Sequence, residues 1–171
     1  SLSKHDDAQK IIKSCHKQVA VIADDIGMAT SLQCKGLVDL LPDNNKSHWS
    51  LADYAFDLKT TADGSPSGFS DQCWRMGYDI QAQFYIDLLR LAGREITMFG
   101  FITVETFGDY QVSIHYIEQW SAEYRAGLEK TSDYRSRYLE CVRTNHWPGY
   151  GDDWKKVTFK PWQLKKEREF Q

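Results

Sequence analysis

Two carboxylates and a lysine stand in strand-like runs of this chain, and together they could support hydrolysis. Asp57 and Lys59 are two residues apart in the run 55–61. Because side chains alternate along a strand, both should point to the same face. Asp39 lies in the earlier run 37–41, and a turn between the two strands would bring it beside Asp57. Such a pocket could bind a divalent cation and activate water for attack on a phosphodiester.

Periodicity and turn signals predict the elements that must position these residues. We expect helices over 4–17, 72–92 and 121–144, and strands over 18–22, 32–41, 51–60, 96–106 and 110–117. Turns are predicted at 24–27 and 42–45. Three consecutive strands with short turns favour an antiparallel meander, and a helix before the fourth strand allows a crossover. The predicted class is α/β (α+β), with a mixed central sheet of about five strands flanked by helices.

The stretch 63–72 contains two glycines, a proline and three serines and is predicted to be a loop. It leaves the strand that carries Asp57, so it either touches substrate or forms a plain surface connection.

The predicted helix 72–92 has an apolar face and an opposite polar face. The apolar face comprises Tyr78, Ala82, Tyr85, Leu88, Leu89 and Ala92, and the polar face comprises Asp79, Gln83, Asp87 and Arg90. Gln81 falls on the apolar side, one turn before Tyr85. A buried amide needs hydrogen-bond partners. Gln81 therefore either bonds to the sheet as a structural residue or projects with Tyr85 into the pocket.

The composition is that of an ordinary soluble globular protein. The chain has 171 residues, 42% apolar and 26% charged, which suits one domain over 1–150 followed by a basic extension over 151–171. We expect no membrane span, because no apolar run approaches ~18 residues. The extension is either a solvated tail or an arm that contacts phosphates; its basic residues are Lys155, Lys156, Lys160, Lys165, Lys166 and Arg168.

The overall charge and the cysteines give no positive sign of a nucleic-acid-binding surface or of a cysteine metal site. The net charge of −3 does not by itself indicate a nucleic-acid binder. No two cysteines have metal-knuckle spacing, and they are predicted to be reduced and mostly buried in a cytoplasmic protein. They are Cys15, Cys34, Cys73 and Cys141.

The order of the motifs resembles the core of the PD-(D/E)xK nucleases. Asp39 is followed by Asp57-Leu58-Lys59, and the helix after it reads Gly-Tyr-x-x-Gln-x-x-x-Tyr over 77–85. Together with the stretches 34–39, 57–61 and 147–150, this is similar to the RecE-type (exonuclease VIII-like) exodeoxyribonucleases of phages and prophages. The resemblance spans about residues 26–150 and implies a restriction-endonuclease-like fold.

The resemblance also implies roles for individual residues. Asp39, Asp57 and the backbone carbonyl of Leu58 would bind Mg²⁺ or Mn²⁺. Lys59 would orient or deprotonate the attacking water, or stabilise the charge that develops on the phosphate. The helical pair Gln81 and Tyr85 would position the scissile phosphate or the lysine.

By the same resemblance the chain would be a metal-dependent exodeoxyribonuclease that digests linear double-stranded DNA, in the 5′→3′ direction, in phage-type homologous recombination. A single-strand-annealing recombinase and a closed homo-oligomeric ring are the implied partners. Family members usually carry a further acidic or histidine residue on a helix before the core. His5, Asp6, Asp7 and His16 precede the core here, and none stands in a matching context.

Two alternatives remain open. One is a nuclease of the same fold with a four-cysteine iron–sulfur centre, which the solitary Cys141 disfavours. The other is a catalytically weak or inactive nuclease fold that binds DNA or a partner protein.

Overall fold

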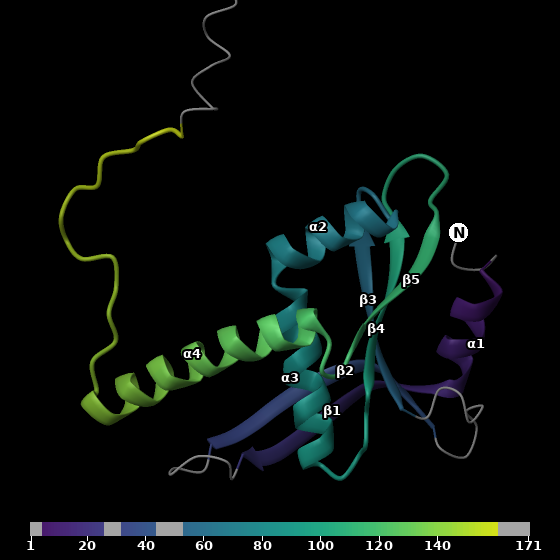
Figure 1. Ribbon diagram of the computed structural model, residues 1–171, viewed down its shortest axis with the longest axis horizontal. Helices are drawn as coiled ribbons and strands as arrows, with labels where there is room; N and C mark the ends of the chain where they lie inside the picture. Colours follow the sequence, from purple (N-terminus) through teal and green to yellow (C-terminus); the bar gives the residue numbers. More distant parts are fainter. Residues whose placement is uncertain (1–4, 26–31, 44–52, 161–171) are drawn as a thin grey trace, which may run out of the picture. The chain divides into compact units, whose positions relative to one another are not determined.

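The computed structural model describes residues 5–25, 32–43 and 53–160. Within these ranges the elements follow in the order α1 (Asp6–Ser14), β1 (Cys15–Asp25), β2 (Leu32–Pro42), β3 (Tyr54–Thr61), α2 (Pro66–Met76), α3 (Tyr78–Leu91), β4 (Met98–Glu105), β5 (Val112–Glu118) and α4 (Ala122–Thr144) (Figure 1). The strands form one sheet in the order β1-β2-β3-β4-β5. Only the β3–β4 pair is parallel. The predicted mixed five-stranded α/β fold is confirmed.

The chain divides into two compact units, residues 1–136 and 137–171. The described part of the second unit holds the last turns of α4, followed by residues 145–160, which form no helix or strand and are exposed. Within this unit Tyr138 packs edge-on against Trp147 at 5.8 Å between ring centroids. The boundaries 1–150 and 151–171 given above stay a prediction.

In the first unit the helices cover both faces of the sheet. On one face α1 buries Ala8 and Ile11 against Phe56 and Ile102 (Figure 1). On the other face α2, α3 and the first turns of α4 form the larger core with apolar side chains from all five strands. Burial of these two apolar layers is the main favourable contribution to folding.

Strands β1 and β2 exchange faces at one point along their length. Cys15 and Leu40 pack in the α1 core, whereas Val19 and Val38 pack in the α3 core. A regular strand would keep Cys15 and Val19, four residues apart, on the same face. The exchange coincides with Gln18, whose φ of 53° is left-handed, and with an interruption of the register, in which Gln18 and Asp39 lie between the pairs Lys17–Leu40 and Val19–Val38. The β1–β2 pair therefore turns about its own axis here, so that side chains before and after this point face opposite sides of the sheet.

The prediction of a loop over 63–72 is wrong. Residues from Pro66 onward form α2. Ser65 caps this helix by accepting a hydrogen bond from the Gly68 N–H, and Pro66 occupies the first turn, an arrangement that favours helix initiation. The predicted single helix over 72–92 is accordingly two helices, separated at Gly77 by a left-handed φ of 71°.

The ends of several other elements differ from the predictions. The first helix stops at Ser14, and residues 15–17 belong to β1, because they pair with the end of β2. Asp24 and Asp25 continue β1 instead of turning, while the rest of the predicted turn 24–27 lies outside the described residues. Of the predicted turn 42–45, Pro42 ends β2 and residues 44–45 lie outside the described residues.

The predicted polar face of α3 is not a solvent face. Asp79 and Gln83 are 4% and 2% exposed, because α4 packs over them. Lys130 of α4 pairs with Asp79 at 2.6 Å, and the Tyr124 hydroxyl donates to Asp87 at 2.7 Å. The capping serine of α4 was predicted correctly: Ser121 accepts a hydrogen bond from the Tyr124 N–H at 3.2 Å.

The four cysteines, all among the described residues, form no disulfide, and they are half-buried rather than mostly buried as predicted. Burial raises the pKa of Cys15 and of Cys73 to about 11, so neither is an activated nucleophile. Among the helices of the described residues, none combines the length and the apolar character that crossing a membrane requires.

Candidate active site

Asp39 and Asp57 meet where β2 and β3 pair. Leu40 lies opposite Phe56 in this antiparallel ladder, which sets the two acids beside each other. The Leu58 N–H donates to Oδ2 of Asp39 at 3.0 Å. The predicted convergence of Asp39, Asp57 and the backbone of residue 58 is therefore present in the geometry.

Lys59 is held against Asp57 by an ion pair and an aromatic ring. Its Nζ lies 2.6 Å from Oδ2 of Asp57 and 4.5 Å above the ring of Tyr78. Gln72 of α2 donates to the Tyr78 hydroxyl at 3.3 Å and accepts from the Thr61 hydroxyl at 2.6 Å. This chain of contacts ties the lysine to two helices and leaves its side chain 18% exposed.

Gln81 and Tyr85 contact the sheet from α3 in different ways. Gln81 donates from Nε2 to Oδ1 of Asp57 at 2.8 Å. The Tyr85 hydroxyl accepts from the Leu37 N–H at 3.3 Å and donates to the Leu37 carbonyl at 3.1 Å, while its ring stacks on Phe99. Gln81 therefore orients a proposed metal ligand, and Tyr85 fixes the backbone of β2 two residues before Asp39.

The position of Asp57 penalises its negative charge. The residue is 6% exposed, and burial raises the pKa of its carboxyl above the ordinary value; nearby Asp39 acts in the same direction, while Lys59 and Gln81 oppose it. Two neighbouring carboxylates with one ammonium leave an excess of negative charge in a partly dry site. A cation would offset that excess.

The residues present fit a divalent cation. Oδ2 of Asp57 is buried and lies 2.6 Å from the Lys59 ammonium, and a carboxylate oxygen has a second lone pair with which it could bind a cation. Carboxylate and carbonyl oxygens are the ligands that Mg²⁺ and Mn²⁺ prefer. No group of three or more His, Cys, Asp or Glu side chains suited to a metal occurs within the described ranges. Asp39, Asp57 and the Leu58 carbonyl stay the ligands predicted from the sequence, and the first two lie beside each other on β2 and β3.

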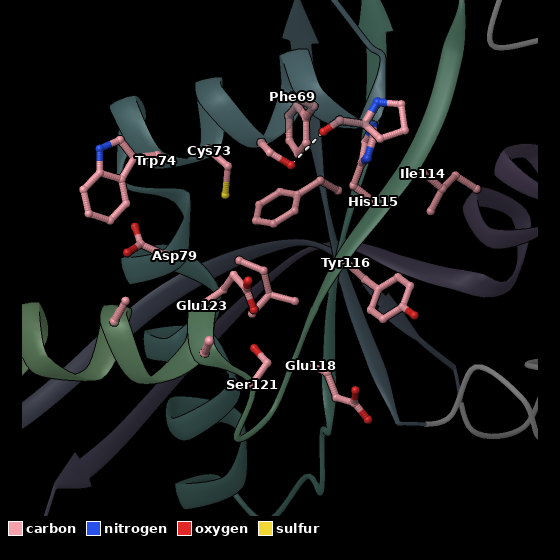
Figure 2. Close-up of a pocket in the computed structure, with 16 residues that line it drawn as sticks. Phe69, Cys73, Trp74, Asp79, Ile114, His115, Tyr116, Glu118, Ser121 and Glu123 are labelled. Carbon is pink, nitrogen blue, oxygen red and sulfur yellow. Dashed lines mark hydrogen bonds between the residues drawn. The ribbon is translucent and has the colours of Figure 1, made fainter.

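A cavity lies elsewhere in the first unit, away from Asp39 and Asp57. It measures about 770 Å³, and Figure 2 shows its lining from α2, β5 and the start of α4, including Phe69, Trp74, His115 and Glu123. A smaller cavity of about 440 Å³ lies beside Tyr85 and is also lined by Lys35 and Leu37. We place the candidate site at the meeting of β2, β3 and α3, because Asp39, Asp57 and Lys59, the residues of the motif, come together there.

Three contacts of this site were missed in the sequence. Gln18 of β1 donates from Nε2 to Oδ1 of Asp39 at 2.8 Å, and Gln72 and Tyr78 support Lys59 from the α2–α3 region. The upstream residues considered above act elsewhere: His5 caps α1, and His16 lies 3.5 Å from Asp43. A glutamine in a short strand carries no motif, so pattern alone offered no signal for Gln18.

The model of a family described as a PDDEXK-like domain of unknown function (DUF3799) matches residues 1–156. The chain belongs to this PDDEXK-like family. The matched segment includes every residue of the candidate site. No curated protein matches the chain.

Two solved structures are similar to this PDDEXK-like chain to different degrees. A proposed exonuclease from Eubacterium rectale is 16% identical, with a TM-score of 0.60, over 95% of this chain and 65% of that one; the chain thus spans about two thirds of that protein, and the likeness concerns the fold. An alkaline exonuclease from Laribacter hongkongensis is 16% identical over 84% of this chain and 71% of that one, with a TM-score of 0.35. A likeness of that degree carries no weight here.

Proposed function

We propose that this chain is a metal-dependent exodeoxyribonuclease that hydrolyses phosphodiester bonds of linear double-stranded DNA. The observation that carries the proposal is the convergence of Asp39 and Asp57 from neighbouring strands, with Lys59 at 2.6 Å from Asp57. Membership of the PDDEXK-like family and a fold shared with the Eubacterium rectale protein, whose name describes it as an exonuclease, support a nuclease.

Each residue would have a distinct part in the reaction. A divalent cation held by Asp39, Asp57 and the Leu58 carbonyl would supply a water of lowered pKa and a charge for the phosphate oxygens. Lys59 would orient the attacking water while the water oxygen bonds to phosphorus. The Lys59 ammonium would also offset the negative charge that grows on the phosphate as the ester P–O bond breaks. The Gln81 amide would keep Asp57 aimed at the site.

The finer parts of the proposal rest on the motif resemblance. They are 5′→3′ polarity, a role in phage-type recombination beside a single-strand-annealing recombinase, assembly into a closed ring, and a choice of Mg²⁺ or Mn²⁺. Lys35 lines the cavity beside Tyr85 and is a cation that could contact a DNA phosphate near the site.

The test is digestion of end-labelled linear and covalently closed circular duplex DNA with Mg²⁺. We expect release of nucleotides from the linear substrate only, and loss of release by more than about 100-fold in Lys59→Ala, because charge stabilisation at the reacting phosphate is removed. Lys10→Ala is the matched control, since Lys10 is an exposed lysine of α1 that pairs with Asp7, outside the candidate site.

The inactive-module alternative predicts a different outcome. The chain would then bind duplex DNA equally well with Mg²⁺ or EDTA and cut neither substrate. Full activity in Lys59→Ala would instead remove Lys59 from the mechanism.

A further inference from the structure

Gln18 adopts a backbone conformation that glycine would adopt at lower cost. Its φ is 53°, while its neighbours Lys17 and Val19 pair regularly with Leu40 and Val38. The left-handed conformation has a structural use, because it rotates β1 at the point where the two strands exchange faces. Rotation of the strand depends on the positive φ and not on any side chain. Glycine is the residue that usually occupies such a position.

The contacts of the Gln18 side chain explain why position 18 holds glutamine and not glycine. The pairs Lys17–Leu40 and Val19–Val38 flank Gln18 and Asp39, and Nε2 of Gln18 donates to Oδ1 of Asp39 at 2.8 Å. The other oxygen of the same carboxylate accepts the Leu58 N–H at 3.0 Å. Asp39 is therefore held from both sides, by a side chain of β1 and by the backbone of β3.

Burial does not explain this contact. Gln18 is exposed, so water could satisfy its amide without the strained backbone. Strain that persists at a residue in contact with a candidate site is a sign of function. What the strained conformation provides is a directed donor aimed at a proposed metal ligand.

A neutral amide suits this task better than a charged group. A lysine here would form an ion pair with Asp39 and weaken the negative charge that attracts a cation, and a glutamate would repel the carboxylate. The amide fixes the orientation of Asp39 and leaves its charge intact. It also leaves one lone pair of Oδ1 for a cation.

We propose that Gln18 is a positioning residue that orients the Asp39 carboxylate for divalent-cation binding. This inference rests on the proposed function in taking Asp39 as a metal ligand. Gln18 acts through Asp39 and does not touch the DNA.

The experiment compares Gln18→Gly and Gln18→Asn with the parent chain. Glycine keeps the left-handed backbone and removes the amide; asparagine tolerates that backbone but is one methylene shorter. Manganese binding is measured by calorimetry without DNA, and thermal unfolding is measured in EDTA. Gln33→Ala is the matched control, because Gln33 is an exposed glutamine of the same hairpin whose amide contacts Asp24, outside the site.

We expect both Gln18 variants to bind Mn²⁺ about tenfold more weakly, the scale on which lost outer hydrogen bonds to metal ligands act. Their melting temperatures in EDTA should stay within a few degrees of the parent, and Gln33→Ala should bind as the parent does. In DNA digestion the Mg²⁺ concentration for half-maximal rate should rise by a similar factor, while the KM for duplex DNA stays unchanged.

Parental Mn²⁺ affinity in either folded Gln18 variant would overturn the inference. So would a raised KM for DNA with an unchanged Mg²⁺ requirement, since Gln18 would then contact substrate. Asp57→Asn distinguishes a failure of the role of Gln18 from a failure of the proposed metal site. If it abolishes Mn²⁺ binding while the Gln18 variants bind normally, only the role of Gln18 fails. If the parent binds no Mn²⁺, the metal-dependent function fails and the role of Gln18 fails with it.

Discussion

The amide of Gln81 donates a hydrogen bond to Oδ1 of Asp57 at 2.8 Å, which joins α3 to the buried carboxylate of β3. Gln81→Ala removes that donor and leaves a buried acid less well oriented. We expect the DNA cleavage rate to fall about 10–100-fold, as for other hydrogen-bond partners of metal ligands. The free energy of unfolding should fall by only about 1 kcal/mol, the usual net contribution of one hydrogen bond.

The control for this change is Gln111→Ala, because Gln111 is exposed just before β5. It should retain the parental rate. If Gln81→Ala cleaves DNA as fast as the Gln111 variant, Gln81 has no part in orienting Asp57.

A substitution at Tyr85 can distinguish a residue that fixes the backbone of β2 from a residue that contacts the DNA. Tyr85→Phe keeps the ring stacked on Phe99 at 5.4 Å and removes only the hydroxyl that bridges the Leu37 backbone. We expect the free energy of unfolding to fall by about 1 kcal/mol, measured by urea denaturation. We also expect kcat to fall with KM for DNA unchanged, because the hydroxyl fixes the strand that carries Asp39. An increase in KM alone would mean that Tyr85 contacts the DNA instead.

Gly127 sets the distance between α3 and α4. A Cβ at this position would collide with the backbone carbonyl of Asp79 and lie 3.1 Å from the Cβ of Gln83. Backbone cannot yield as a flexible side chain can, so Gly127→Ala should lower the free energy of unfolding by about 2–3 kcal/mol. Gly149→Ala is the control, since its Cβ would meet nothing within 4 Å. Equal stability of the two variants in urea would show that α4 does not pack on α3 in this way.

The environment of His115 leads us to expect that the free energy of unfolding falls in mild acid. Its ring stacks on Phe69 at 4.5 Å, and burial lowers its pKa, while the Gly64 carbonyl acts in the opposite direction. The neutral ring is therefore favoured in the folded state. Its contribution is complete above the unfolded-state pKa of about 6.5 and is lost as the pH falls through that value towards the lower folded-state pKa.

The measurement is urea denaturation between pH 7.5 and pH 5. The parent should lose stability across this range, and His115→Gln should lose less. His146→Gln changes an exposed histidine and should leave the parental slope intact. An unchanged slope in His115→Gln would assign the acid sensitivity to other groups.

Much of the fold was predictable because it depends on local pattern. Period-2 alternation placed Asp57 and Lys59 on one face of a strand, and Ser121 marked the start of α4. The segment 63–72 was wrongly predicted to be a loop because its residues are typical both of loops and of the start of a helix. Ser65 and Pro66 were taken as loop residues, although a serine cap followed by proline also begins a helix.

The sequence by itself determined which residue types could do chemistry and which strands carry them, since side-chain alternation along a strand is a local property. Only the tertiary structure decided their partners. Gln81 reaches Asp57 because α3 lies on that face of the sheet, and Asp79 is buried because α4 covers it. Gln18 meets Asp39 through the register of β1 on β2. Such contacts join residues far apart in the chain, and they depend on packing that no local period encodes.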